Sequence, residues 1–301
     1  MSSAFTSKAI AIDLESTLPD PRSGERRITA IGAFHPFNGA IFHWNGPPRD
    51  LPTGIARLVD FCRDADLIIG HNWRRHDRLL LEPFAAARPL LELPVLDTLE
   101  LSPLAFPRNP YHRLVKDYKL VSETKNDPVA DARQCWQLLT DQCAAFQRLH
   151  PSLLGLYRTL LGSQPGTAYK RLFDALDAPV IPPGQILHTL TDHMRLPFVA
   201  PSTIVFDAER AIGMDGAGSN SPQTHVTRLT LPQVCNALLQ ARLEPLLRTP
   251  DHAPALAYTL AWLTTVSDAK VSDANSVVPA WVRMQFPELS PLLRQLRDTP
   301  C

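Results

Sequence analysis

Strand-like and helix-like segments alternate through the first half of this chain, and that alternation constrains its fold more than any other feature. Apolar runs rich in β-branched residues predict five strands, at Ala9–Leu14, Ile28–His35, Ala40–Trp44, Leu67–Ile69 and Val95–Leu96. The second and third strands are joined through Asn38-Gly39, a dipeptide typical of a β-hairpin. Helical periods predict helices at Pro52–Arg63, Asp77–Ala87 and Pro128–Leu149. This order predicts an α/β domain with a mixed five-stranded sheet flanked by helices.

Strand signals nearly vanish after residue 149, where prolines separate short helical periods. The chain has 29 prolines against 13 glycines, which predicts short helices joined by stiff connections. We expect helices at Leu153–Leu161, Tyr169–Leu176, Pro183–Met194, Leu231–Leu247 and Pro254–Val266, and a loop at Ala211–Gln223. The chain is therefore divided into an α/β domain, residues 1–149, and a mostly α-helical domain, residues 150–301.

Composition excludes several classes of protein. Hydrophobic residues make up 45% of the chain, enough for a sizeable core, and no apolar run is long enough to span a membrane. Lysine plus arginine and aspartate plus glutamate balance at 30 each, which argues against binding nucleic acid by bulk charge but allows a local basic groove. The five cysteines are scattered without a CxxC pair, which favours a reducing, cytoplasmic location. Neither a signal peptide nor a phosphate-binding P-loop is recognisable.

An acidic pair ends the first predicted strand. Asp13 and Glu15 are two residues apart, so their side chains project from the same face of the strand. Two carboxylates this close repel each other unless a cation lies between them. The pair therefore indicates a metal site, although surface strands also carry such pairs without one.

Two more acidic residues lie at the starts of predicted helices. Asp77 closes the run IIGHNWRRHD, in which a buried strand ends and a helix begins; a capping role would also explain it. In the run NDPVADA, Asp127 and Pro128 suit the N-cap and the first helical position. Asp131 falls one turn further, so it cannot be the cap and needs another reason to point inward.

The segments AIDLES, IIGHNWRRHD and NDPVADA, in this order and setting, resemble the DEDD family of 3′–5′ exonucleases over about residues 8–145. The resemblance implies a ribonuclease H-like fold, with Asp13, Glu15, Asp77 and Asp131 as metal ligands and Asp13 bridging. Carboxylate oxygens suit Mg²⁺ or Mn²⁺. Two such ions would activate the attacking water and stabilise the leaving 3′-oxygen.

The third motif departs from the family pattern. One branch of the family has His five residues before the last Asp, and the other has Tyr four residues before it; here these positions hold Asn126 and Asp127. An amide can orient water but cannot take its proton at neutral pH. Losing a general base typically costs roughly 10²–10⁴ in rate, although metal-bound hydroxide could retain part of the activity. His112 is the substitute base that we would test first. His71 and His76 are also candidates, although a structural or phosphate-facing role fits each of the three histidines better than a catalytic one.

Basic residues and tyrosines alternate just before the third motif, a mixture that suits phosphate contacts and base stacking. A solvated basic face is the alternative explanation, because acids are interspersed. The expected nucleic-acid contacts are Asn72, Arg74, Arg75, Tyr111, Arg113, Lys116, Lys119 and Asn126.

A longer resemblance extends beyond the nuclease motifs. Residues 97–120, the Asn-x-Pro-x-x-Asp form of the third motif and residues 280–301 look like a bacterial group in which a DEDD-type domain precedes a RecQ-type helicase. This implies a helicase motor on the same native chain, of which the present sequence would be an N-terminal portion.

Three functions therefore stay open. The first is a metal-dependent 3′–5′ exonuclease that acts on single-stranded DNA ends, with RNA not excluded. Its activity would be coupled to unwinding by the helicase in DNA repair or defence. The second is a nucleic-acid-binding module that keeps the fold but has lost efficient catalysis, and the third is a protein-interaction role for the helical half. Four retained carboxylates favour the first function, because buried acids without an ion are costly. The missing His or Tyr favours the second.

Overall fold

The computed structural model of this 301-residue chain describes residues 8–108, 127–194, 244, 247–248 and 253–266. The chain divides into two compact units between Ile181 and Pro182. Each unit is described by itself below.

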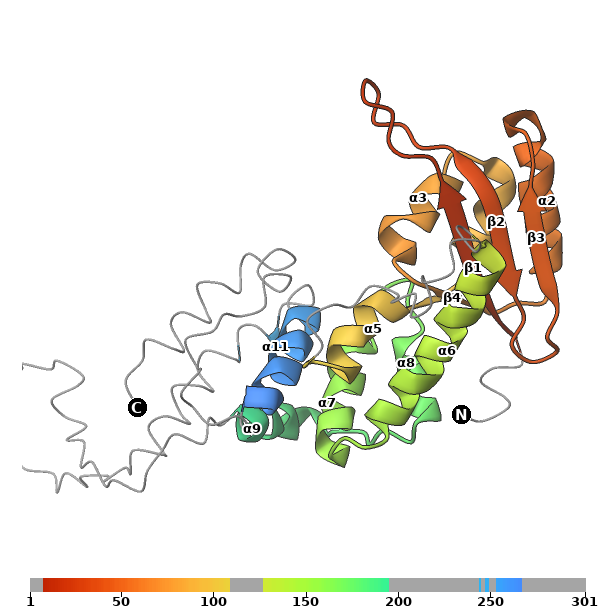
Figure 1. Cartoon of the computed structure of the whole chain (residues 1–301). Helices are drawn as coiled ribbons and strands as arrows, with labels where there is room; N and C mark the ends of the chain where they lie inside the picture. Colours follow the sequence, from red (N-terminus) through yellow and green to blue (C-terminus); the bar gives the residue numbers. More distant parts are fainter. Residues whose placement is uncertain (1–7, 109–126, 195–243, 245–246, 249–252, 267–301) are drawn as a thin grey trace, which may run out of the picture. The chain divides into compact units, whose positions relative to one another are not determined.

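Five strands form one mixed sheet in the first unit (Figure 1). They are β1 (Ala9–Ser16), β2 (Ile28–Phe34), β3 (Ile41–Asn45), β4 (Leu67–Gly70) and β5 (Val95–Asp97). The strand order is β3-β2-β1-β4-β5. Strand β2 runs antiparallel to both β1 and β3, whereas β4 runs parallel to both β1 and β5. This confirms the mixed five-stranded sheet that the sequence predicts.

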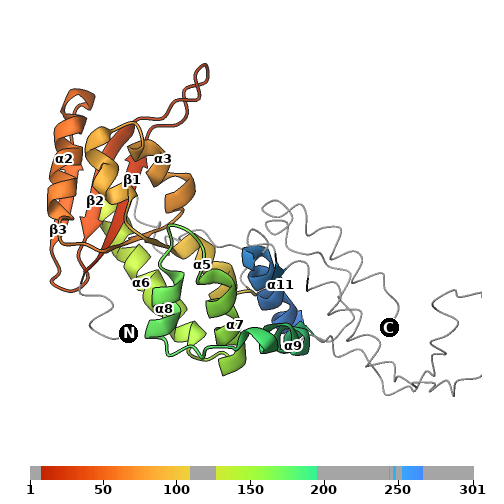
Figure 2. The same ribbon diagram turned by 180° about the vertical axis from the view of Figure 1, so that it is seen from behind.

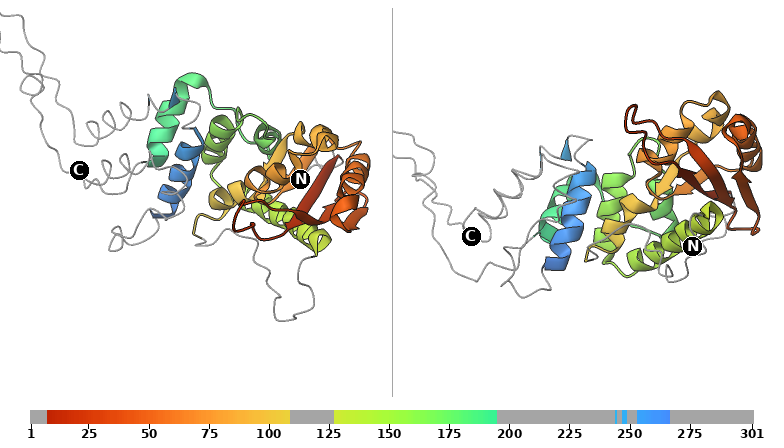
Figure 3. Two further views of the ribbon diagram at one scale, coloured as in Figure 1. Left: turned by 90° about the horizontal axis from the view of Figure 1, so that it is seen from above. Right: turned by 45° about the horizontal axis from the view of Figure 1, so that its top comes forward.

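Helices cover both faces of the sheet. Those of the first unit are α2 (Leu51–Phe61), α3 (Asp77–Leu81), α4 (Arg88–Leu91), α5 (Thr98–Ala105), α6 (Pro128–Phe146), α7 (Pro151–Leu161) and α8 (Tyr169–Ala175), with short 3₁₀ turns at Pro48–Asp50, Trp73–Arg75 and Ala85–Ala87. Helix α2 packs beside β2 and β3 (Figure 2), and α6 crosses β1 and β2 (Figure 3).

The face of the sheet under α2 carries the large apolar side chains. Along β1 these are Ile10, Ile12 and Leu14, all buried, and their neighbours on β2 are Ile31 and Ala33. Because side chains alternate along a strand, the residues between them must face α6 instead. The sequence pattern of β1 thus assigns each face of the sheet to a different helix.

The face under α6 carries small side chains, and this lets the helix approach the strands closely. Gly32 on β2 pairs with Asp13 on β1, so the two share this face. A Cβ atom added at Gly32 would lie 2.2 Å from the carbonyl carbon of Pro128, the first residue of α6. Only glycine fits under this turn of the helix.

Two local predictions were wrong. A single helix was expected at residues 77–87, but α3 ends at Leu81, and Pro83 separates it from a 3₁₀ turn and α4. Proline lacks a backbone N–H, and its ring clashes with the carbonyl of the residue four positions earlier in a helix, which explains the break. Helix α5 was not expected, because its buried residues occupy most of its circumference and leave no helical period to detect.

The division between the two units lies later than the predicted boundary at 149/150, because α7 and α8 belong with the sheet. The Val95 amide donates to the carbonyl of Gly166 at 3.1 Å, and the Ala168 amide donates to the carbonyl of Val95 at 2.9 Å. Arg171 of α8 also pairs with Asp66, with Nη2 3.0 Å from Oδ1. These contacts cover the outer edge of β5 and connect the segment after α7 to the sheet.

The described residues of the second unit are mostly helical. Helix α9 (Pro183–Met194) packs against α11 (Ala253–Val266). The predicted loop at residues 211–223 and nearly all of the predicted helix at 231–247 lie outside the described residues. Across the described parts of the chain, no helix is both long enough and apolar enough to cross a membrane.

The contact at Gly32 gives a stability prediction. We expect Gly32→Ala to lower the free energy of unfolding by about 1–3 kcal/mol, because the added methyl group must displace the backbone of α6. Urea denaturation followed by circular dichroism measures this. Gly184→Ala is the control, since Gly184 lies in α9 with nothing within 4 Å of an added Cβ. Equal effects of the two substitutions would contradict a tight α6–sheet contact.

Candidate metal site

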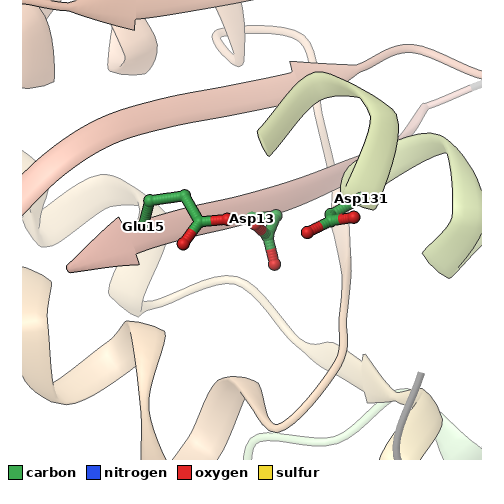
Figure 4. Close-up of side chains that lie close together, drawn as sticks. All are labelled: Asp13, Glu15 and Asp131. Carbon is green, nitrogen blue, oxygen red and sulfur yellow. The ribbon is translucent and has the colours of Figure 1, made fainter. Parts of the chain in front are cut away.

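Three carboxylates converge where β1 meets the first turn of α6 (Figure 4). They belong to Asp13 and Glu15 of β1 and to Asp131 of α6, and one oxygen atom of each lies within 4.8 Å of the other two. Asp131 is buried, whereas Asp13 and Glu15 are partly exposed. The sequence analysis named all three residues, and the fold brings them together.

Local rules of strand and helix geometry place these three side chains. Asp13 and Glu15 share the α6 face of β1, because they are two residues apart. The side chain of Asp127 caps α6 by accepting the backbone N–H groups of Val129 at 3.0 Å and Ala130 at 3.3 Å. This confirms the predicted N-cap. Asp131 follows one turn later, and its amide donates to the Asp127 carbonyl at 3.0 Å.

The donor set fits a hard divalent cation. All three candidate ligands offer carboxylate oxygen, which Mg²⁺ and Mn²⁺ prefer, and no thiolate or imidazole belongs to the cluster. Three like charges within this distance repel each other, and a bound cation relieves that repulsion. Asp131 also lies in the first turn of α6, where the helix dipole favours negative charge.

Asp77 lies against β1 but outside this three-carboxylate cluster. It is only 2% exposed, and its Oδ1 accepts the backbone N–H of Leu14 at 3.1 Å. The same oxygen lies 3.4 Å from Nδ1 of His76. Burial raises the pKa of the Asp77 carboxyl, while these two partners lower it. The role of Asp77 as a fourth metal ligand stays a prediction.

A buried thiol lies among the acidic residues. Burial raises the pKa of Cys135, and the charges of Asp97, Asp13 and Asp77 raise it further. Cys135 follows Asp131 by one turn of α6 and lies 3.5 Å from Oγ1 of Thr98. Asp13 and Asp77 are therefore both close enough to act on the same group, from β1 and from α3.

The two histidines of the second motif have different environments. His71 contacts the Thr98 hydroxyl through Nδ1 at 3.0 Å, and that hydroxyl donates to the Gly70 carbonyl at 3.1 Å. Burial lowers the pKa of His71 to about 4, so this side chain is neutral at pH 7. The hydrogen bond with Asp77 raises the pKa of His76, against the effect of its partial burial.

The predicted nucleic-acid contacts are only partly within the described residues. Asn72 has a left-handed backbone with φ of 65°, and its amide donates to Asp97 Oδ1 at 2.8 Å, so it serves as a turn residue. Arg74 and Arg75 are both exposed, and Nη1 of Arg74 lies 3.6 Å from Oε2 of Glu100. The other contacts stay predictions because they lie outside the described residues: Tyr111, Arg113, Lys116, Lys119 and Asn126. The candidate base His112 lies outside the described residues as well.

Sequence analysis assigned no role to Asp97. Its buried carboxylate accepts the backbone N–H groups of Asn72, Arg74 and Leu99, at 2.8, 3.3 and 3.0 Å. It thereby caps α5 and holds the turn after β4 in place. The signal was available, since Asp97 follows an apolar strand and suits an N-cap.

Comparisons with known proteins give no family for this chain. No protein-family model matches it, and no curated protein matches it either. Among solved structures, it is similar to a family B DNA polymerase from the hyperthermophilic archaeon Pyrobaculum calidifontis, at 13% identity and a TM-score of 0.29. The match covers 86% of this chain and 46% of the polymerase chain, so the present chain spans about half of that structure.

Asp97 gives a prediction about pH. Burial raises its pKa to about 6 in the folded protein, so the folded state binds this proton more tightly than the unfolded state does. Stability contributed by this group therefore rises as the pH falls through 6. Relative to Asp97→Asn, which cannot titrate, the wild type should gain about 1 kcal/mol in unfolding free energy between pH 7 and pH 5. Denaturant titrations at both pH values measure this gain. A constant difference, or one of opposite sign, would contradict a buried, ionisable Asp97.

Proposed function

We propose that this protein is a metal-dependent 3′–5′ exonuclease with a ribonuclease H-like fold, which hydrolyses phosphodiester bonds at single-stranded DNA ends. The observation that carries the proposal is the convergence of Asp13, Glu15 and Asp131 from β1 and α6. Clustered carboxylates can bind divalent cations, and such cations can promote the hydrolysis of a phosphodiester bond.

The arrangement of the sheet supports the fold that this function requires. Asp13 and Glu15 lie on β1, the central strand, and Asp131 lies in the first turn of the helix that crosses it. The exonuclease family that the motifs resemble has its acidic residues in the same order along the chain. The RecQ-type motor on the same native chain, and a role in DNA repair or defence, rest on the longer sequence resemblance alone.

The residues that would hold two Mg²⁺ or Mn²⁺ ions are Asp13, Glu15, Asp77 and Asp131. When bound, the ions would supply activation of the attacking water and stabilisation of the leaving 3′-oxygen. The protein contributes the positions of the oxygen ligands. Asp131 is held by the capped first turn of α6, and Asp77 is held by the Leu14 amide.

The residue that takes the proton of the attacking water is a separate question. Asp127 occupies one of the two family positions for this role, but its carboxylate accepts two backbone N–H groups at the start of α6. That structural use favours the second candidate function, a nucleic-acid-binding module that keeps the fold and cleaves weakly. Asn126 would then orient water without deprotonating it, and His112 is the first candidate for a substitute base.

Digestion of a 5′-labelled single-stranded oligonucleotide with Mn²⁺ tests this function. We expect a ladder that shortens from the 3′ end. Asp13→Ala should reduce cleavage by more than about 100-fold. Losing a residue that only hydrogen-bonds to a metal ligand costs up to about 100-fold, and losing a ligand itself should cost more. Asp60→Ala is the control, because Asp60 is an exposed residue of α2 that pairs with Arg63.

Undiminished cleavage by Asp13→Ala would reject the site. An oligonucleotide that stays intact but is retarded on a native gel would support the binding module instead. Cleavage lost in His112→Ala as well would identify the proton acceptor.

A further inference from the structure

His76 connects the end of β1 to the start of α3 through both of its ring nitrogens. Nε2 lies 3.3 Å from the hydroxyl oxygen of Ser16, and Nδ1 lies 3.4 Å from Oδ1 of Asp77. The His76 side chain is 25% exposed, whereas the Asp77 side chain is 2% exposed. An imidazole at the rim of the site thus contacts a carboxylate buried beneath it.

The chemistry of the partners sets the direction of these hydrogen bonds. An ionised carboxylate only accepts hydrogen bonds, so Nδ1 of His76 donates its proton to Asp77. In the neutral ring Nε2 then has the lone pair, and the Ser16 hydroxyl donates to it. Ser16, His76 and Asp77 therefore form a chain of hydrogen bonds that ends on Oδ1 of the carboxylate.

Oδ1 of Asp77 has hydrogen-bond partners from two different parts of the chain. The backbone N–H of Leu14, on β1, donates to Oδ1 at 3.1 Å. Nδ1 of His76, the residue directly before α3, lies 3.4 Å from the same oxygen. Helix α3 has only five residues and gives the Asp77 side chain little support of its own. These two hydrogen bonds on Oδ1 restrict the rotation of the carboxylate and so limit the directions in which Oδ2 can point.

We propose that His76 is a positioning residue, which fixes the Asp77 carboxylate in the orientation needed to bind a divalent cation beside Asp13. This inference rests on the proposed function. Hydrogen bonds to metal-ligating carboxylates orient them, and losing such a partner typically costs 10–100-fold in metal affinity or activity. The sequence motif places His76 directly before Asp77. Only the fold brings Ser16 to His76 and Leu14 to Asp77.

The surroundings of His76 agree with a place at the edge of the metal site. Glu15, one of the three clustered carboxylates, acts electrostatically on His76, and so does Arg26 from the β1–β2 connection. His76 is therefore within electrostatic range of an acidic residue of the cluster and of a basic residue. It belongs to the same neighbourhood as the candidate ligands without being one of the three clustered residues.

Mn²⁺ titration followed by electron paramagnetic resonance tests this role, because free Mn²⁺ is counted directly and no catalysis is needed. We expect His76→Ala to weaken Mn²⁺ binding by about 10–100-fold. His76→Asn keeps an N–H donor near the position of Nδ1, so it should retain most of the affinity. His76→Gln places its donor near the position of Nε2, toward Ser16, and should behave like the alanine variant.

His188→Ala is the matched control. His188 also pairs through Nδ1 with an aspartate, Asp192, at 3.0 Å, but on an exposed surface of α9. Unfolding free energies of all variants are measured alongside. A merely structural link would lower stability without separating the asparagine variant from the glutamine variant in Mn²⁺ affinity.

The outcomes separate the two proposals. Weaker binding in the alanine and glutamine variants, with affinity retained in the asparagine variant, supports the positioning role. Wild-type affinity in all three variants overturns it and leaves the proposed function standing. Failure of the wild type itself to bind Mn²⁺ overturns both.

Discussion

The contact between Gly32 and the first turn of α6 is the constraint on which the candidate site depends. Because position 32 has no side chain, the backbone of Pro128 lies directly against β2, opposite Asp13 on β1. Asp131, one turn further along the helix, then reaches the acidic pair of β1. Larger side chains on the other face of β1 bind α2 to the sheet, so the two faces perform different tasks.

The acidic residues of this domain divide into two physical groups. Asp97, Asp127 and Asp77 accept backbone N–H groups at the ends of strands and the starts of helices, and in this way they fix local structure. Asp13, Glu15 and Asp131 instead lie close to one another, where their mutual repulsion favours a cation. Asp77 connects the two groups. It accepts a backbone N–H as the first group does, and the donor is Leu14, which lies between Asp13 and Glu15 of the second group.

Local sequence rules predicted the strands, the Asp127 cap and the face shared by Asp13 and Glu15, because each depends on neighbours in the chain. The break at Pro83 follows from the same rules, because a proline ends a helical period. The covering of β5 by residues 166–168 could not be predicted, since Val95 and Thr167 are far apart in sequence. The same holds for the Leu14–Asp77 hydrogen bond. Along β1 and β2, small residues such as Gly32 alternate with large apolar residues, and this pattern indicates a close approach of a helix to the small-residue face.

Anomalous X-ray diffraction from crystals grown with Mn²⁺ tests the central claim most directly, because it locates the metal without an assay of activity. The account predicts an anomalous peak bounded by carboxylate oxygens of Asp13, Glu15 and Asp131. Crystals that contain Mn²⁺ but show no peak among these three residues would contradict it.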